Sequence, residues 1–254
     1  MPRVAKLDLA DFQPAPDLLK NRVILVTGAG SGIGAAAANA CAEKGATVIL
    51  LGRTQETLER TYDQIVGTGN PEPMLMPFDL ESNDIETYYA IAQAIDSQFG
   101  QLDGLVHSAG VLGQKTLIEQ YNHQAWEKVF QINVHGSFHL TRAVMPLMRR
   151  SDQPRIVFLS SSVGRQGRAY WGAYAASKFA VEGLAETLAD ELTTHPDFSV
   201  NVVNPGGTRT AMRAAAYPGE DPATVPAPES HNALMLFLLS EHCAGVTGHS
   251  YDAH

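Results

Sequence analysis

Two residues four positions apart, Tyr174 and Lys178, have the chemistry of an acid–base pair. They stand at the start of a stretch that predicts a helix, where side chains at i and i+4 share one face. An unperturbed phenol has a pKa of about 10 and is a poor proton donor and acceptor at neutral pH. A neighbouring ammonium stabilises the phenolate and lowers that pKa. The spacing therefore indicates a catalytic tyrosine assisted by a lysine.

The helix face that carries this pair continues as an apolar stripe. Its further members are Val181, Ala185, Leu188 and Leu192. A lysine on an inward face is costly unless its charge is needed, which strengthens the catalytic interpretation. Tyr170 lies outside the stripe, in the predicted loop before the helix, and we expect it and Trp171 to pack at the entrance of a cleft.

A second motif, "TGAGSGIG" at 27–34, joins a short apolar run to an Ala-rich helical pattern. Glycines there allow a tight turn and a close approach to a diphosphate, and the helix N-terminus offers free N–H donors. A tight turn without a ligand is the alternative. The strand–turn–helix context near the start of the chain favours a dinucleotide site.

The next strand pattern ends in "LLGRT", which bears on the choice of dinucleotide. NAD sites usually carry an acid near this point to bind the ribose 2′-hydroxyl, but Gly52 stands there and Arg53 follows. A guanidinium pairs with a 2′-phosphate that a carboxylate would repel, so we predict NADP(H). If Arg53 is only a solvated residue at a helix start, NAD(H) also fits. Asp79 is expected to accept a hydrogen bond from the adenine amino group, or else to cap the next helix.

Short apolar runs alternate with helical patterns from Arg22 onward. The strand patterns cover 22–28, 46–52, 73–80, 102–110, 154–162 and 198–207, and the helical ones 33–45, 54–66, 84–99, 125–148 and 173–192. This order predicts one α/β domain, 21–254, with a parallel sheet and right-handed crossovers. Residues 1–20 are expected to form an N-terminal arm outside the core. The segment 207–230, rich in Pro, Gly and Ala, is expected to be a mobile loop that covers the site.

Composition narrows the function further. A net charge of −9 over 254 residues argues against nucleic acid and against anionic membrane surfaces. Cys41 and Cys243 match no metal or redox spacing, so no metal site is expected. The chain opens with no signal-peptide pattern, and the apolar run at 233–239 is too short to cross a bilayer. We therefore expect a cytoplasmic protein.

Together these motifs resemble the short-chain dehydrogenase/reductase family. The family's glycine motif is matched by Thr27-Gly28-x-x-x-Gly32-x-Gly34 and its catalytic motif by Tyr174-x-x-x-Lys178. The resemblance extends from Asn21 to about Asp252. The segments "SSSVGRQGRAYWGAYAASK" and "NPGGTRTAMR" further resemble its YciK-type branch, for which the resemblance fixes no substrate. The resemblance implies a Rossmann-type doubly wound parallel sheet with helices on both faces. It also implies hydride transfer between nicotinamide and a small-molecule carbonyl or alcohol substrate, and a homodimer or homotetramer.

The resemblance extends to the remaining catalytic residues. The family serine stands thirteen residues before the tyrosine, which corresponds to Ser161, with Ser162 as the second candidate. The family asparagine corresponds to Asn133, which would position a water for a proton relay or, alternatively, kink its helix. Tyr174 would protonate the substrate oxygen, Ser161 would hydrogen-bond it, and Lys178 would hold the cofactor ribose.

The cofactor-binding set that motifs and resemblance imply spans the whole domain. It comprises Gly28, Ser31, Gly32, Ile33, Gly34, Arg53, Asp79, Leu80, Ser108, Ala109, Gly110, Tyr174, Lys178, Pro205, Gly206, Thr208 and Thr210. Three positions depart from the family pattern, because His107-Ser108 stands where the family commonly has Asn-Asn before Ala-Gly, and Ser31 is the third. His107 replaces a usual asparagine, and we expect it to hydrogen-bond neighbouring strands rather than catalyse. Ser31 stands where some NADP-preferring relatives carry a basic residue.

Three questions stay open at this point. Arg165 and Arg168 either attract an anionic substrate or are solvated loop charges. Epimerisation or dehydration on the same scaffold is one alternative activity, although such relatives usually have a longer substrate domain. A catalytically silent NADP(H)-binding sensor or scaffold protein is the other, and it predicts loss of a Ser/Tyr/Lys set that is intact here.

Overall fold

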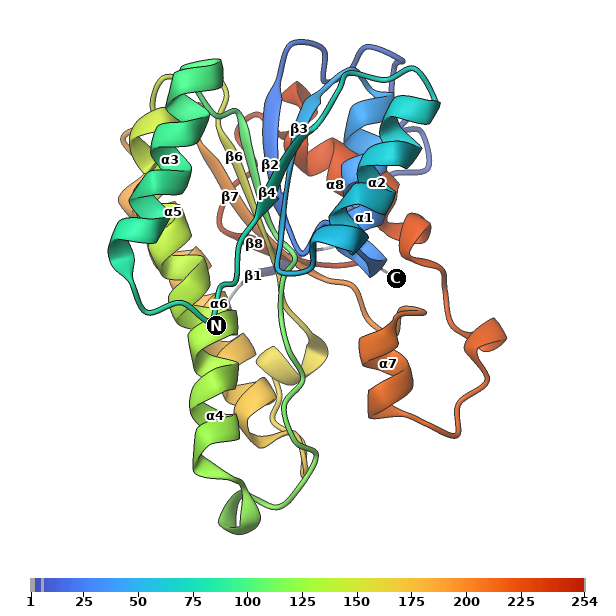
Figure 1. Ribbon diagram of the computed structural model, residues 1–254. Coiled ribbons are helices and arrows are strands. Elements are labelled where there is room, and N and C mark those ends of the chain that lie inside the picture. Colours follow the sequence, from blue (N-terminus) through green and yellow to red (C-terminus); the bar gives the residue numbers. More distant parts are fainter. Residues whose placement is uncertain (1–2, 6, 254) are drawn as a thin grey trace.

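The computed structural model describes residues 3–5 and 7–253, and its centre is an all-parallel eight-stranded sheet (Figure 1). The strands are β1 (Arg3–Ala5), β2 (Val23–Thr27), β3 (Thr47–Gly52), β4 (Met74–Pro77), β5 (Gly104–His107), β6 (Arg155–Leu159), β7 (Ser199–Asn204) and β8 (His249–Asp252). Their order is β1-β8-β7-β6-β5-β2-β3-β4. The chain therefore winds outward in both directions from β2 and β5. The crevice at the carboxyl ends of these two strands is the usual ligand site of such sheets.

Helices cover both faces of the sheet, as Figure 1 shows. They are α1 (Gly32–Glu43), α2 (Gln55–Gly67), α3 (Ile85–Phe99), α4 (His123–Phe130), α5 (Gly136–Met148), α6 (Gly172–Glu191), α7 (Ala211–Ala216) and α8 (Asn232–Leu239). One apolar core lies between the sheet and α3, α5 and α6, and a second lies under α1, α2 and α8. The strands are apolar on both sides because each side is covered. The predicted Rossmann-type architecture is confirmed.

The prediction of an N-terminal arm outside the core is wrong for the described part of residues 1–20. β1 pairs with β8 and extends the sheet by one strand, with Val4 opposite Ser250. Leu19 is fully buried in the core under α1, and its backbone N–H donates to the Lys44 carbonyl oxygen at 2.8 Å. The edge strand β1 and its neighbour β8 are short and have no extended apolar run, so the pattern of the sequence did not predict them.

The helix expected over 125–148 consists of α4, one π-helical turn (Gln131–His135) and α5. The segment 207–230 is also more regular than the irregular loop we expected. It contains α7, capped where the Thr210 hydroxyl accepts a hydrogen bond from the Arg213 N–H at 3.2 Å. Among the described residues, no helix combines the length and apolar character that a membrane span requires.

Candidate active site

A cavity of about 370 Å³ opens at the carboxyl ends of β2, β5, β6 and β7, beside α7. The sequence-predicted residues that line it are Gly28, Ser31, Gly32, Ile33, Ser108, Ala109, Gly110, Ser161, Tyr174, Lys178, Pro205, Gly206, Thr208 and Thr210. An adjoining cavity of about 210 Å³ shares four of these and adds Arg53, Asp79 and Leu80. Of the predicted site residues, Gly34 and Asn133 line neither cavity. The structure thus gathers residues from seven distant segments around one continuous space.

Tyr174 and Ser161 meet inside this space. Tyr174 lies in the first turn of α6, on the face that also carries Lys178. It is 8% exposed, and its hydroxyl hydrogen-bonds Ser161. Ser161 lies between β6 and a 3-10 turn (Ser162–Gly164), in extended backbone. Ser162, the second candidate, is exposed and lines neither cavity, because the 3-10 turn carries it outward.

Lys178 alone does not lower the pKa of Tyr174 in this structure. Burial raises the pKa of Tyr174 to about 12, and its hydrogen bond with Ser161 opposes part of that rise. The ammonium of Lys178 lies 5.6 Å from the centre of the tyrosine ring and donates to the Leu159 carbonyl oxygen at 2.7 Å. Burial lowers the pKa of Lys178 itself to about 8, an effect that the charge of Glu182 opposes. Burial therefore dominates the pKa of Tyr174, and the expected lowering by the Lys178 charge is not found here.

Asn133 lies in the π-helical turn, 1% exposed, behind the cavity wall. Its side-chain oxygen accepts from the Val111 N–H at 2.8 Å. Its amide nitrogen donates to the Val111 carbonyl oxygen and to the Ser177 hydroxyl, both at 3.0 Å. The asparagine therefore joins the helical segment 123–148 to the loop after β5 and to α6. Its neighbour Gly110 has to be small, because a Cβ there would lie 3.3 Å from the Asn133 side-chain oxygen.

In the glycine-rich turn, the backbone packs directly against the backbone of the segment after β5. Gly28 has φ +67°, and a Cβ on it would lie 3.0 Å from the backbone of Ala109. A Cβ on Gly34 would collide with the Gly28 carbonyl oxygen, so this glycine packs α1 against the turn rather than lining the cavity. The first turn of α1 has no acidic residue, and the Ser31 side chain does not cap it. Its N–H groups therefore face the cavity without a competing negative charge.

Thr27 is a residue of this site that the sequence analysis did not assign. Its hydroxyl oxygen accepts from the Ser108 N–H at 3.1 Å and from the Ala109 N–H at 3.0 Å. It thus fixes the segment after β5 against the glycine turn. Its place as the first residue of "TGAGSGIG" was the available signal.

The second cavity holds the residues expected to choose between dinucleotides. Arg53 is exposed, and none of the ion pairs among the described residues includes it. Its guanidinium is therefore available to a ligand. The Asp79 carboxylate accepts from the Glu81 N–H at 3.0 Å, which makes a local turn. It does not cap α3, whose N-cap is Asp84.

His107 is a buried structural residue. Its Nε2 hydrogen-bonds the Thr141 hydroxyl of α5 at 2.8 Å, and its ring stacks on Phe158 of β6 at 4.6 Å. The polar partner is therefore on a helix, where we expected a neighbouring strand. Burial, and to a smaller extent the charge of Lys178, lowers the pKa of His107 to about 3, so the ring is neutral at physiological pH.

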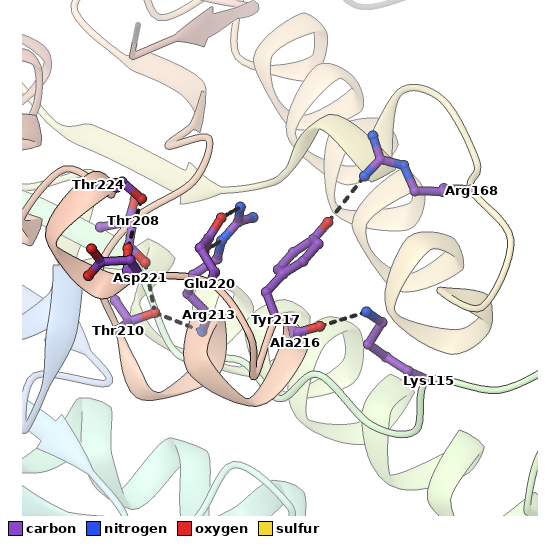
Figure 2. Close-up of polar contacts among 10 residues, drawn as sticks. All are labelled: Lys115, Arg168, Thr208, Thr210, Arg213, Ala216, Tyr217, Glu220, Asp221 and Thr224. Atoms are coloured by element: carbon purple, nitrogen blue, oxygen red, sulfur yellow. Dashed lines mark hydrogen bonds and ion pairs between the residues drawn. The ribbon is translucent and has the colours of Figure 1, made fainter.

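The segment around α7 forms the outer wall of the cavity. Figure 2 shows the polar contacts that hold this segment. Lys115 donates to the Ala216 carbonyl oxygen at 2.6 Å, at the carboxyl end of α7, and lies 4.7 Å from the Tyr217 ring centre. Arg168 donates to the Tyr217 hydroxyl at 3.2 Å, and Tyr170 beside it is exposed. Apolar wall residues that the sequence analysis missed are Leu112, Met212 and Ala216. No pattern marks them, because their roles depend on how α7 folds back.

Arg165 does not lie at the mouth of the cavity. It is therefore neither placed to attract an anionic substrate nor a solvated loop charge, the two roles that the sequence suggested. It is 16% exposed and forms ion pairs with Glu182 and Asp252. In the part of the chain that the structure describes, no group of three or more His, Cys, Asp or Glu side chains could hold a metal ion.

Comparison with known proteins places this geometry in context. Residues 22–221 match the family model of the short chain dehydrogenases. The chain is 47% identical to the uncharacterized oxidoreductase YciK of Escherichia coli K12, over 95% of both chains. It is 32% identical to a 3-oxoacyl-[acyl-carrier-protein] reductase of Thermotoga maritima, over 91% of this chain and 95% of that protein.

A solved structure of a short chain dehydrogenase from Escherichia coli CFT073 in complex with NADPH is also similar to the chain. It superposes with a TM-score of 0.92 at 46% identity, covering 95% of this chain and 100% of the other. One from Shigella flexneri 2a in complex with NADP gives a TM-score of 0.91 at 47% identity, covering 94% and 99%.

Proposed function

The chain belongs to the short-chain dehydrogenase family, and we propose that it transfers a hydride between NADP(H) and a carbonyl or alcohol substrate. The observation that carries this proposal is the meeting of Tyr174, Ser161 and Lys178 in the cavity that also holds the glycine turn. A proton donor, a second hydrogen-bond donor and a dinucleotide cradle are the parts that such a reaction needs.

The residues around the glycine-rich turn fit a dinucleotide phosphate. Three features suit a diphosphate. Gly28 has no side chain, the N-terminus of α1 has no side-chain cap, and the first turn of α1 has no acidic residue. The free guanidinium of Arg53 suits a 2′-phosphate. The complexes of similar proteins with NADP and NADPH support the same cofactor. Ser108, Ala109, Gly110, Pro205, Gly206, Thr208 and Thr210 would contact its nicotinamide half.

Catalysis would then depend on three side chains. NADP(H) held by these residues would supply the hydride for reduction of the carbonyl carbon, and NADP would take it up in oxidation of the alcohol. In reduction the Tyr174 hydroxyl donates its proton to the carbonyl oxygen, which becomes an alcohol. The Ser161 hydroxyl hydrogen-bonds the same oxygen, and Lys178 holds the ribose. Asn133 acts through position, because its amide keeps Val111 and Ser177 in place. The water relay remains a further proposal.

The segment 207–230 would determine which carbonyl compound enters. It supplies α7, the outer wall of the cavity, and loops of this kind commonly set specificity. The apolar side chains Leu112, Trp171 and Met212 form one cluster with Tyr174. We therefore expect the group next to the carbonyl to be apolar.

A paired measurement tests the function against the silent-sensor alternative. NADPH binding is followed by fluorescence, and NADPH oxidation is then measured across ketones, aldehydes and acyl thioesters. We expect binding and turnover of at least one class. Tight binding with no turnover of any class would favour the sensor. Products of epimerisation or dehydration without net oxidation of NADPH would favour the other alternative.

A further inference from the structure

A buried carboxylate lies one helical turn beyond Lys178 on the same face of α6. Glu182 is 3% exposed, which is rare for a carboxylate unless it is paired. Its Oε1 lies 3.4 Å from Nε of Arg165, a long contact, and its Oε2 has no hydrogen-bond partner among the described residues. The ion pair with Arg165 thus leaves part of this negative charge uncompensated.

Arg165 is held more firmly by the C-terminal strand than by Glu182. Its two terminal nitrogens bond the Asp252 carboxylate at 2.7 Å and the Ser250 hydroxyl at 2.6 Å, both on β8. The same Asp252 oxygen accepts from the Asn204 side chain at 2.7 Å. A chain of polar contacts therefore runs from α6 to β8 and the end of β7. These contacts hold the Arg165 guanidinium so that its Nε stays 3.4 Å from the Glu182 carboxylate.

The other groups around Lys178 offer it no counter-charge. The ammonium donates to a neutral carbonyl, that of Leu159. His107, from β5, is uncharged because its pKa is about 3. Tyr174 is neutral because its pKa is about 12, and Asn133, from the π-helical turn, carries no charge. Glu182 is the carboxylate that acts on Lys178.

We propose that Glu182 is a positioning residue that acts through Lys178 by keeping its side chain protonated, and that Arg165, anchored by β8, limits the share of its charge available to the lysine. This rests on the proposed function, since it assigns the lysine a catalytic task. It also gives the C-terminal strand an electrostatic role in the active site. A structural ion pair alone would hold α6 to the segment after β6 and would leave the titration of Lys178 unaffected.

The test is the pH dependence of kcat/KM for carbonyl reduction with saturating NADPH. Lys178 has a pKa of about 8, whereas the pKa of Tyr174 is about 12, so activity should fall as pH rises through about 8. Glu182→Gln removes the stabilising charge and should move this alkaline limb to lower pH by about one unit. Arg165→Gln frees the same charge and should move the limb the opposite way. Glu182→Asp, which keeps the charge, should retain most of the wild-type profile.

The matched control is Glu186→Gln, an exposed carboxylate one turn further along α6, which should leave the limb in place. Limb shifts of opposite sign for Glu182→Gln and Arg165→Gln support the proposal. Unchanged limbs, or equal losses of activity in both without a shift, overturn it. If Glu182→Gln does not fold, Arg165→Gln decides alone, since only a shift to higher pH agrees with the proposal. Activity that survives in Tyr174→Phe would instead overturn the proposed function.

Discussion

At the scale of single residues, the site depends on which hydroxyls reach the cavity. Ser160, Ser161 and Ser162 are consecutive, yet Ser161 is the one bonded to Tyr174. Ser160 also lines the cavity, but its buried hydroxyl has no hydrogen-bond partner among the described residues, and Ser162 is exposed. Ser161 lies in extended backbone just after β6, and the 3-10 turn that begins at Ser162 carries the next hydroxyl outward.

Replacing Ser161 with alanine should remove one hydrogen bond to the developing alkoxide. Loss of one such donor typically lowers kcat by about 10²-fold to 10³-fold, and we expect a fall in this range with the KM for NADPH unchanged. Ser162→Ala is the matched control and should retain activity. Steady-state kinetics on both variants would contradict the assignment if Ser162→Ala were the impaired one.

We also expect the choice of cofactor to be decided at one residue, Arg53. Arg53→Ala removes a guanidinium that has no carboxylate partner among the described ion pairs, so no compensating contact is broken. A charge-assisted contact to a 2′-phosphate contributes about 1.5–3 kcal/mol, so the ratio of kcat/KM with NADPH to that with NADH should fall by about tenfold or more. An unchanged ratio would show that Arg53 does not discriminate between the two cofactors.

At the scale of elements, Gly164 allows the turn after Ser161 to pack against α6. A Cβ there would lie 2.7 Å from the Ser160 hydroxyl and 2.8 Å from the Lys178 Cβ, closer than real contacts. Gly164→Ala should push the turn from the helix and separate Ser161 from Tyr174, lowering kcat by about tenfold or more, since small misplacements of catalytic groups are costly. Gly167→Ala, with open space around it, is the control. Equal activities of the two variants would argue against this packing role.

Sequence patterns predicted the central elements well and the peripheral ones poorly, for physical reasons. Buried strands such as β2 and β6 are continuous apolar runs, and amphipathic helices such as α2 have a clear period. The π-helical turn at 131–135 depends on contacts of Asn133 with Val111 and Ser177, which are distant in sequence. The same holds for α7, whose position is set by partners on other loops.

At the scale of the whole molecule, the described residues of the N-terminal segment, 3–5 and 7–20, are part of the folded domain. Leu19 is fully buried, so Leu19→Ala should leave a cavity and destabilise the protein by about 2–5 kcal/mol. Leu117, which is 41% exposed, provides a control substitution to alanine that should cost much less. Urea denaturation of both variants measures the difference. Equal stabilities would mean that this N-terminal segment contributes little to the core.

The central claim is that one cavity binds NADP(H) and uses Tyr174 as its proton donor. The most direct measurement compares wild type and Tyr174→Phe in the same carbonyl reduction, with NADPH affinity measured in parallel. Phenylalanine fills the same buried space but has no proton to donate. We expect NADPH to bind both proteins with similar affinity, and turnover to fall by at least about 10²-fold in the variant. Carbonyl reduction at the wild-type rate in Tyr174→Phe would contradict the account.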